Sequence, residues 1–524
     1  MQFLTRSLIY FFCFCSSLSI AQTSFKGGEF IDIANIKALH LYHGNMWFLP
    51  DSGISRCEFP KGSGQTIGFA SSLWISGYDA GSNLKTAAHT YSEFAPVFWP
   101  GPLDVSITNS TTAYNSSAMW ARIWKINSST IDSFLSLSSH TLSNTPTAIL
   151  EWPGKGNPYA KGANGASLVI SRDMAPFVDV NADGIYNPLN GDYPLMKGSQ
   201  MLWWIYNNSS VIYGVTTNTL KLECKAMAYA YKQKTVADNI IFYESTITNL
   251  GSQNLDSLRI GVFADIDLPN SFGDDCGIDS SRRLAFNYSS KNSGTTHTFS
   301  PIAGITILDF PGDSYHSYGP LGSEMFFTNS NVLPNGNPTT DSDFNNYLNE
   351  RDLKGTFIEH SGIDSSSQCR LSVAGADRRF VIGTPEYHFI PGNSKHIAYA
   401  LVAADSADGC PNTNYTTLFQ TADSAYKIYW NPKRITPLSA GGTILNPTTL
   451  KVYPNPSHDQ VFIETAEAND LTIRVYDGLG RLMGVQSNRT SNKITLDIHT
   501  LSPGIYSLIC QNAKGIQKSI FVKN

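Results

Sequence analysis

The sequence contains little charge. Of its 524 residues, 37 are lysine or arginine and 42 are aspartate or glutamate, so 15% are charged and the formal net charge is -5. An ordinary soluble domain is about 25% charged. The chain has no basic runs, whereas nucleic acids and anionic membrane surfaces require clustered lysine and arginine. We therefore expect no nucleic-acid partner.

Common catalytic motifs are also missing. The chain has no HExxH, no GxSxG, no Walker A loop and no Rossmann glycine fingerprint, and its 11 histidines do not pair at helical metal-binding spacing. After residue 21, no segment is long and apolar enough to form a transmembrane helix. Carboxylate pairs for glycoside hydrolysis stay open, because the fold sets their separation.

The chain is nevertheless rich in residues that form a core. Hydrophobic residues make up 41% of it and aromatic residues 12%, which excludes a disordered protein. At this length we expect two to four domains.

The N-terminus has the pattern of an export signal. Arg6 precedes an apolar run over residues 8–15, and small residues lead to Ala21. This order predicts a secretory signal peptide over residues 1–21 with cleavage after Ala21. Removal of Arg6 would make the net charge about -6.

Six of the eight cysteines follow the expected cleavage site. An even number in an exported protein permits three disulfides, with fifteen possible pairings. Some of them could instead be buried free thiols. The mature part has no CxxC, which argues against a thiol redox site or a zinc ribbon. The six are Cys57, Cys224, Cys276, Cys369, Cys410 and Cys510.

Most of the body has the pattern of strands and turns. Period-two alternation over residues 258–263, 246–248 and 397–402 predicts strands bounded by turn residues. Apolar side chains at spacings of four and three predict a single good helix over residues 414–430. We therefore predict a mainly β protein with antiparallel β-sandwich-like domains and few helices.

Composition suggests where the domains divide. Prolines and paired glycines over residues 431–449 predict a linker. Eight of the nine tryptophans precede residue 205, which suggests a further boundary near residue 210. The expected units are a tryptophan-rich β domain at 22–210, a central β-sandwich-like domain at 211–430 and a C-terminal domain at 450–524.

The C-terminal 75 residues predict a small β-sandwich. Short strands are expected over residues 461–464, 471–476, 494–498, 505–510 and 519–522, with turn residues between them. By pattern alone this domain could be a carbohydrate-binding module, an adhesin repeat or a sorting tag.

Four motifs in order distinguish among these three. They are Tyr453-Pro454-Asn455-Pro456, residues 475–481, residues 501–506 with Gly504 and Tyr506, and a last strand that ends at Lys523. Together they resemble the type A C-terminal sorting domain of Bacteroidetes type IX secretion, an immunoglobulin-like β-sandwich. The resemblance implies export to the periplasm and then passage across the outer membrane by the type IX machinery. The cargo is then released or attached to the cell surface.

One acidic segment in the body matches the front half of a calcium loop. It places Asp179, Asn181 and Asp183 at positions one, three and five, glycine at six and the Ile185 carbonyl at seven. Position twelve is not the glutamate of an EF-hand, so we expect a different calcium loop closed by Asp192. The alternative is an Asx-rich surface turn without a ligand.

A second acidic segment gathers five carboxylates within fifteen residues. Such carboxylates repel one another unless a cation or solvent intervenes. A calcium site, a solvated loop or a catalytic pair could each account for them. The residues are Asp265, Asp267, Asp274, Asp275 and Asp279.

Segments of the body also have a familiar pattern. Residues 72–77, 98–104, 191–194, 377–380 and 389–392 resemble large exported proteins of the same bacterial group that carry this sorting domain. The resemblance supports the expected domains and implies no mechanism.

We therefore expect a secreted or cell-surface structural or adhesive protein, with calcium as its cofactor. Its expected partners are the type IX machinery and surface glycans or other cell-surface proteins. The alternative is a carbohydrate-active protein, either a binder or a hydrolase. It would use an acidic cleft and exposed tryptophans such as Trp74, Trp99 or Trp203, although large aromatics in β-rich proteins are more often core residues.

Overall fold

The computed structural model describes residues 28–49, 53–91, 97–208, 219–269, 274–289, 301–311, 321–329, 334–358, 377–405, 415–430, 451–464, 472–476, 482–490, 493–512 and 515–524. The expected signal peptide at 1–21 and the expected linker at 431–449 lie outside these ranges.

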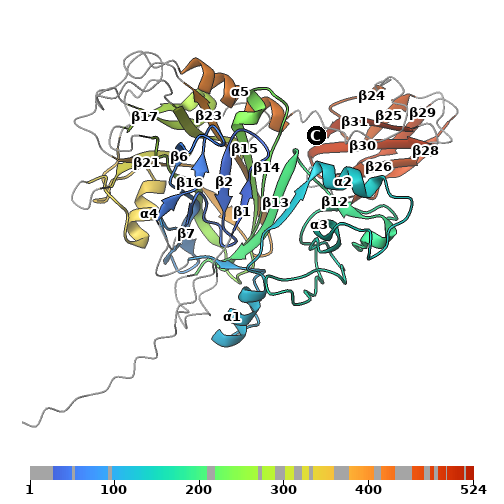
Figure 1. Ribbon diagram of the computed structural model, residues 1–524, viewed down its shortest axis with the longest axis horizontal. Helices are drawn as coiled ribbons and strands as arrows, with labels where there is room; N and C mark the ends of the chain where they lie inside the picture. The colour runs from blue at the N-terminus through green and yellow to red at the C-terminus, as the bar shows by residue number, and fades with distance from the viewer. Residues whose placement is uncertain are drawn as a thin grey trace, which may run out of the picture.

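A nine-stranded antiparallel sheet forms the centre of the body (Figure 1). Its strands are β9 (Trp99–Pro100), β10 (Trp124–Asn127), β13 (Gln200–Asn207), β14 (Leu222–Ala230), β15 (Ile240–Asn249), β17 (Asp274–Asp279), β18 (Leu284–Ser289), β19 (Pro301–Asp309) and β23 (Ser394–Asp405). They lie in the order β10-β13-β14-β15-β23-β19-β18-β17, and β9 pairs with β13.

A six-stranded antiparallel sheet packs against it. Its strands are β7 (Ala70–Asp79), β8 (Leu84–Ala87), β16 (Leu255–Asp265), β20 (Ser323–Thr328), β21 (Arg378–Gly383) and β22 (Tyr387–Phe389). They lie in the order β20-β21-β16-β7-β8, and β22 pairs with β16.

Smaller sheets and short helices complete the body. One sheet has four strands: β1 (Glu29–Ile31), β2 (Lys37–His40), β5 (Cys57–Glu58) and β6 (Thr66–Gly68). Two further sheets have two strands each: β3 (Phe48–Leu49) pairs with β4 (Ile54–Ser55), and β11 (Phe177–Val178) pairs with β12 (Tyr193–Pro194). The helices are α1 (Ser110–Met119), α2 (Ser128–Leu135), α3 (Thr147–Leu150), α4 (Asp341–Leu348) and α5 (Thr416–Trp430), with 3-10 turns η1 (Pro188–Asn190), η3 (Val236–Asn239) and η5 (Ser280–Arg282).

The central sheet is buried on both faces, because successive side chains of a strand point to opposite sides. On β13, Trp204 belongs to the core shared with the six-stranded sheet. Its neighbour Trp203 belongs to a second core, which α5 and residues 120–186 help to form. Since α5 packs on β23 and β19 (Figure 1), the predicted helix covers a sheet, as its apolar spacing indicates.

Helix α4 covers the outer face of the six-stranded sheet. Thr340 and Asp343 form a capping box that begins this helix. Phe344 and Tyr347 then pack in one cluster with Trp74 of β7. The body therefore has four layers: α4, the six-stranded sheet, the nine-stranded sheet, and α5 with residues 120–186.

Strands from both sides of residue 210 pair with each other. β13 pairs with β14, and β7 pairs with β16 over most of its length. The division expected near residue 210 therefore does not coincide with a boundary between sheets.

The C-terminal residues form two four-stranded antiparallel sheets around a core of their own, which confirms the predicted small β-sandwich. Figure 1 shows them as a separate group of red strands. One sheet is β24 (Lys451–Tyr453), β25 (Gln460–Glu464), β29 (Lys493–Asp497) and β28 (Gln486–Arg489), and the other is β27 (Leu482–Met483), β26 (Thr472–Tyr476), β30 (Gly504–Asn512) and β31 (Gly515–Lys523).

The described cysteines do not bear out a full set of three disulfides. Cys57, Cys224 and Cys510 are buried and form no disulfide with another described residue, and burial raises the pKa of each thiol. Cys369 and Cys410 lie outside the described residues.

Candidate functional site

The first predicted acidic loop is held by its own backbone amides. Asp179 Oδ2 accepts a hydrogen bond from the Gly184 amide at 2.7 Å, and Asp183 Oδ1 accepts one from the Ile185 amide at 2.7 Å. Asn181 Nδ2 donates to Asp183 Oδ2 at 2.8 Å. Gly184 has a φ of +78°, a value that favours glycine at position six.

Asp192, the residue expected to close the calcium loop, contacts the backbone of this loop. Its side chain is fully buried and accepts hydrogen bonds from the amides of Val180 and Asn187, both at 2.8 Å. Burial raises the pKa of the Asp192 carboxyl, and Asp179 and Asp183 raise it further. These contacts are compatible with both the calcium loop and the Asx-rich turn.

The second predicted cluster is divided by the fold. Asp274 begins β17. Asp275, on the same strand, lies 3.9 Å from Arg378 Nε. Asp279 caps η5 and contacts Arg282 at 2.6 Å, and Arg282 also contacts Asp423 of α5 at 2.9 Å. Asp279 thus connects the end of β17 to α5 instead of joining the other carboxylates.

Asp265 and Asp267 instead meet Asp377. One carboxylate oxygen from each of the three lies within 4.8 Å of the others. Antiparallel pairing of β16 with β21 places Asp265 directly opposite Arg379, and Asp377 is two residues before Arg379. We call Asp265, Asp267 and Asp377 the acidic triad.

Arg379 and Tyr91 hold two members of the triad. Arg379 Nε lies 3.2 Å from Asp265 Oδ2, and its NH2 lies 2.9 Å from Asp377 Oδ2. The Tyr91 hydroxyl donates to Asp265 Oδ2 at 2.5 Å, and the Arg379 guanidinium lies 5.0 Å from the centre of the Tyr91 ring. Asp265 Oδ1 and Asp377 Oδ1 are buried and have no hydrogen-bond partner among the described residues.

This environment changes the acidity of the triad. Burial raises the pKa of Asp265 to about 6, although Arg379 lowers it. Burial, together with the charges of Asp265 and Asp377, raises the pKa of Asp267 to about 8. Carboxyls with pKa values near neutrality, held beside a guanidinium and a phenol, are typical of functional sites.

Sequence reasoning found only part of this site. Asp265 and Asp267 were predicted ligands, whereas Asp377, Arg379 and Tyr91 were not. Asp377 and Arg379 stand in a segment that the sequence singled out by resemblance alone. Only the register between β16 and β21 brings that segment to Asp265.

The tryptophans named for sugar stacking belong to the cores. Trp74 is 0%, Trp99 is 3% and Trp203 is 1% exposed. All nine tryptophans fall within the described residues, and eight are buried, while Trp430 is partly buried. None of them offers an open aromatic platform.

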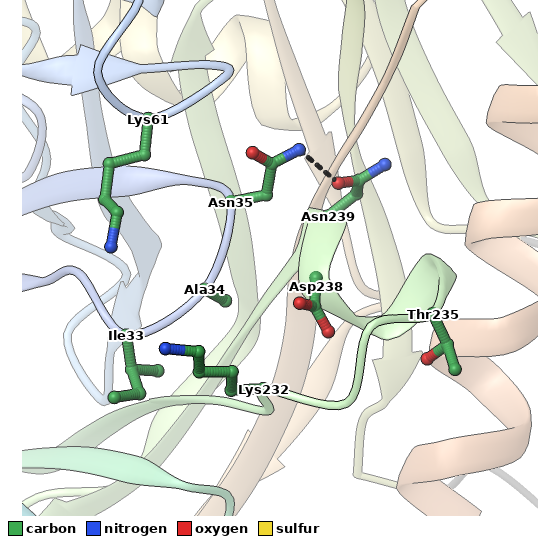
Figure 2. A pocket seen from close by; sticks show the side chains of 8 residues that line it. All are labelled: Ile33, Ala34, Asn35, Lys61, Lys232, Thr235, Asp238 and Asn239. Atoms are coloured by element: carbon green, nitrogen blue, oxygen red, sulfur yellow. Dashed lines mark hydrogen bonds between the residues drawn. The ribbon is translucent and has the colours of Figure 1, made fainter.

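A pocket of about 340 Å³ lies away from the triad, between the N-terminal strands and η3 (Figure 2). Lys61, Lys232 and Asp238 line it, and Asn35 Nδ2 donates to Asn239 Oδ1 across one side at 2.9 Å. Apart from Ile33 and Ala34 its lining residues are polar, and they include none of the predicted site residues.

The sorting motif has a structural role within the C-terminal sandwich. Asn455 Nδ2 donates to the Ile520 carbonyl at 2.9 Å, and Asn455 Oδ1 accepts from the Val522 amide at 2.8 Å. The motif segment is thereby attached to β31, whose last residue, Lys523, forms a parallel bridge with Ser457.

Two further motif residues make local contacts. Tyr506 donates its hydroxyl hydrogen to the Ser502 carbonyl at 2.7 Å, the contact of a tyrosine corner. Gly504 begins β30, and the Tyr453 hydroxyl donates to Glu464 at 2.5 Å. Pro454 and Pro456 flank Asn455 in the sequence, and all three residues are exposed.

Residues 451–523 match the family described as the secretion system C-terminal sorting domain. This match supports a type IX secretion substrate and implies contact with the type IX machinery. No curated protein matches the chain. In the described residues, no helix has both the length and the apolarity to cross a membrane.

Several solved structures are similar to parts of the chain. Titin M4 is 21% identical over 14% of this chain and 90% of its own, with a TM-score of 0.13. A heparan sulfate lyase from Pedobacter heparinus is 8% identical over 63% of this chain and 31% of its own, with a TM-score of 0.20. A putative aldose 1-epimerase from Escherichia coli is 9% identical over 63% of this chain and 99% of its own, with a TM-score of 0.18. Similarities this weak carry no functional conclusion.

Proposed function

We propose that the chain is a type IX secretion substrate whose body acts, in the medium or on the outer cell surface, as a structural or adhesive protein stabilised by calcium. The sorting domain supports export. The role of the body rests on the packing of its own side chains.

The burial of the tryptophans carries this proposal. Sugar-binding platforms need a large aromatic face open to solvent, while Trp74, Trp99 and Trp203 are each at most 3% exposed. Trp74 stacks on Phe263 of the neighbouring strand at 5.0 Å. The aromatic residues thus serve to make a rigid body.

Calcium is assigned to the loop at residues 179–192. Its carboxylates accept hydrogen bonds through both of their oxygens. Asp179, for example, accepts from the Gly184 amide at 2.7 Å and from the Asp183 amide at 3.3 Å. A calcium ion would bind the second lone pairs of these oxygens and reduce the repulsion between Asp179 and Asp183. The loop would then resist opening.

The test is a thermal unfolding series on the exported chain. Saturating calcium should raise the Tm by several degrees and chelation should reverse the rise, because a ligand that binds only the folded state stabilises it. The double variant Asp179→Ala with Asp183→Ala should lose that part of the rise. An equal rise in this variant would overturn the loop assignment.

A carbohydrate-active function is the second candidate, favoured by the raised pKa values of Asp265 and Asp267. It predicts turnover of at least one polysaccharide in a glycan panel and loss of turnover in Asp267→Asn. Asp256→Asn, the same chemical change at an exposed position of β16, is the control. Such turnover would overturn the structural proposal, and its absence together with surface adhesion would support it.

A further inference from the structure

The acidic triad joins the ends of two paired strands. Asp265 is the last residue of β16, Asp267 follows two residues later, and Asp377 directly precedes β21. The three carboxylates come from segments more than a hundred residues apart in sequence, yet one oxygen from each lies within 4.8 Å of the others. This separation suits a single ion between them.

In Asp265 and in Asp377, the two carboxylate oxygens have different surroundings. Arg379 contacts Oδ2 of Asp265 at 3.2 Å and Oδ2 of Asp377 at 2.9 Å. The Oδ1 atoms of both are buried without a hydrogen-bond partner among the described residues, and Asp265 is only 1% exposed. A buried carboxylate oxygen without a partner is costly, so these atoms point to a missing ligand.

The charge of the acidic triad and Arg379 indicates the sign and magnitude of the charge on that ligand. Cation binding requires all three aspartates to be ionised; together with Arg379 they then carry a formal charge of about -2 in a largely buried setting, which a divalent cation would neutralise. Carboxylate oxygens are the ligands of hard cations such as calcium. Arg379 and Tyr91 would act as positioning residues that fix the orientation of the ligating carboxylates.

We propose that Asp265, Asp267 and Asp377 bind one divalent cation, which is calcium in the exported protein. The ion cross-links the end of β16 to the start of β21 and is separate from the loop at residues 179–192. Only the choice of calcium rests on the proposed function. The binding site itself rests on the triad.

The proposal is tested by calorimetric titration of the metal-free exported chain with calcium chloride. The unaltered chain should bind one calcium at the triad in addition to any calcium bound at the loop of residues 179–192. Asp267→Asn and, separately, Asp377→Asn should each bind one calcium fewer per chain. Asp256→Asn, which makes the same chemical change at an exposed position of β16, should bind as many as the unaltered chain.

Each result has one consequence. Loss of one calcium in Asp267→Asn or Asp377→Asn, with the stoichiometry kept in Asp256→Asn, supports the triad site. An unchanged stoichiometry in both triad variants overturns it. Circular dichroism identifies a variant that fails to fold. In that case Asp377→Asn decides, because Asp377 is 25% exposed and its change to asparagine preserves the shape of the side chain.

The combined variant Asp179→Ala with Asp183→Ala separates this proposal from the proposed function. If it loses the loop's part of the calcium-dependent rise in Tm yet still binds one calcium at the triad, both proposals hold. Glycan turnover without any change in triad stoichiometry would overturn the structural role and leave the cation site in place.

Discussion

Asp192, Asp265 and Asp279 carry the same chemical group and have three different kinds of partner. Asp192 accepts hydrogen bonds from two backbone amides. Asp265 contacts the guanidinium of Arg379 and the phenol of Tyr91, and Asp279 forms an ion pair with Arg282. The spacing of acidic residues in the sequence shows where carboxylates are dense. Their partners depend on strand register, which spacing does not encode.

Buried histidines make the stability of the body depend on pH. His40 is fully buried and His89 is 7% exposed. Burial lowers the pKa of each from 6.5 to about 3. Between pH 6.5 and about 3 these two histidines therefore bind more protons in the unfolded chain than in the folded chain, so their contribution to the free energy of unfolding falls as the pH falls through this range.

We predict that His40→Gln makes this decline shallower. The glutamine cannot take a proton, and its amide can keep the hydrogen bond that His40 Nδ1 makes with the Ala38 carbonyl at 3.1 Å. Urea unfolding at pH 7, 6, 5 and 4 should give a slope smaller by up to about 1.4 kcal/mol per pH unit. An identical slope in the variant and the unaltered chain would show that His40 does not contribute.

At the scale of elements, Asn455 connects two parts of the sorting domain that are far apart in sequence. Its side-chain amide makes two hydrogen bonds to β31, one from each of its polar atoms. Its side chain therefore donates one hydrogen bond to β31 and accepts one from it, as a backbone residue does in a pair of strands. This explains in physical terms why an asparagine stands between two prolines, which have no amide hydrogen to donate.

We predict that Asn455→Ala detaches this segment from β31. Loss of two exposed hydrogen bonds should cost about 1–2 kcal/mol, and the Val522 amide should exchange its hydrogen faster, because Asn455 Oδ1 accepts that hydrogen. Hydrogen exchange of the full chain measures both effects. Asn488→Ala on the exposed strand β28 serves as the control, and equal exchange at Val522 in the two variants would count against this role for Asn455.

The positions of individual helices and strands could be predicted from the sequence more reliably than the pairing of strands within the sheets. The apolar spacing that predicts a helix over residues 414–430 corresponds to α5, and alternation correctly located parts of β15, β16 and β23. Nothing local indicated that β16 would lie between β7 and β21. Asp377 was missed for the same reason, since its proximity to Asp265 depends on that long-range pairing.

At the scale of the whole molecule, the sorting domain and the body have separate cores. The core cluster of the sorting domain runs from Val461 to Phe521 and contains no described residue of the body. The two large clusters of the body end at Ala403 and Ala425. Each part therefore buries its apolar surface largely within itself.

We predict that deletion of residues 450–524 blocks export without unfolding the body. In a host with the type IX machinery, the shortened chain should be retained inside the outer membrane, while the full chain reaches the medium or the cell surface. Fractionation with immunoblotting measures this. Circular dichroism and the Tm of the body should stay close to those of the full chain, and surface delivery of the shortened chain would contradict the prediction.

The mainly β character of the whole chain could be predicted because strand patterns recur throughout it. The pairing of strands from the two sides of residue 210 within the same sheets could not be predicted. Clustering of tryptophan before residue 205 suggested a separate N-terminal unit, but Trp203 and Trp204 stand on β13, which pairs with β14. A compositional change marked a densely packed region and not the end of a core.

The strand order of the body also determines when it can fold. β7 ends at Asp79 but pairs with β16, which begins at Leu255, and β15 pairs with β23, which begins at Ser394. Pairings between strands this far apart in sequence are slow to form, because the entropy cost of closing a long loop comes before any stabilising contact. As the chain is synthesised, β7 can pair with β8 but lacks its other neighbour until β16 emerges, and β15 lacks one neighbour until β23 does. The six-stranded sheet therefore cannot be complete before β22 is made, nor the nine-stranded sheet before β23 is made.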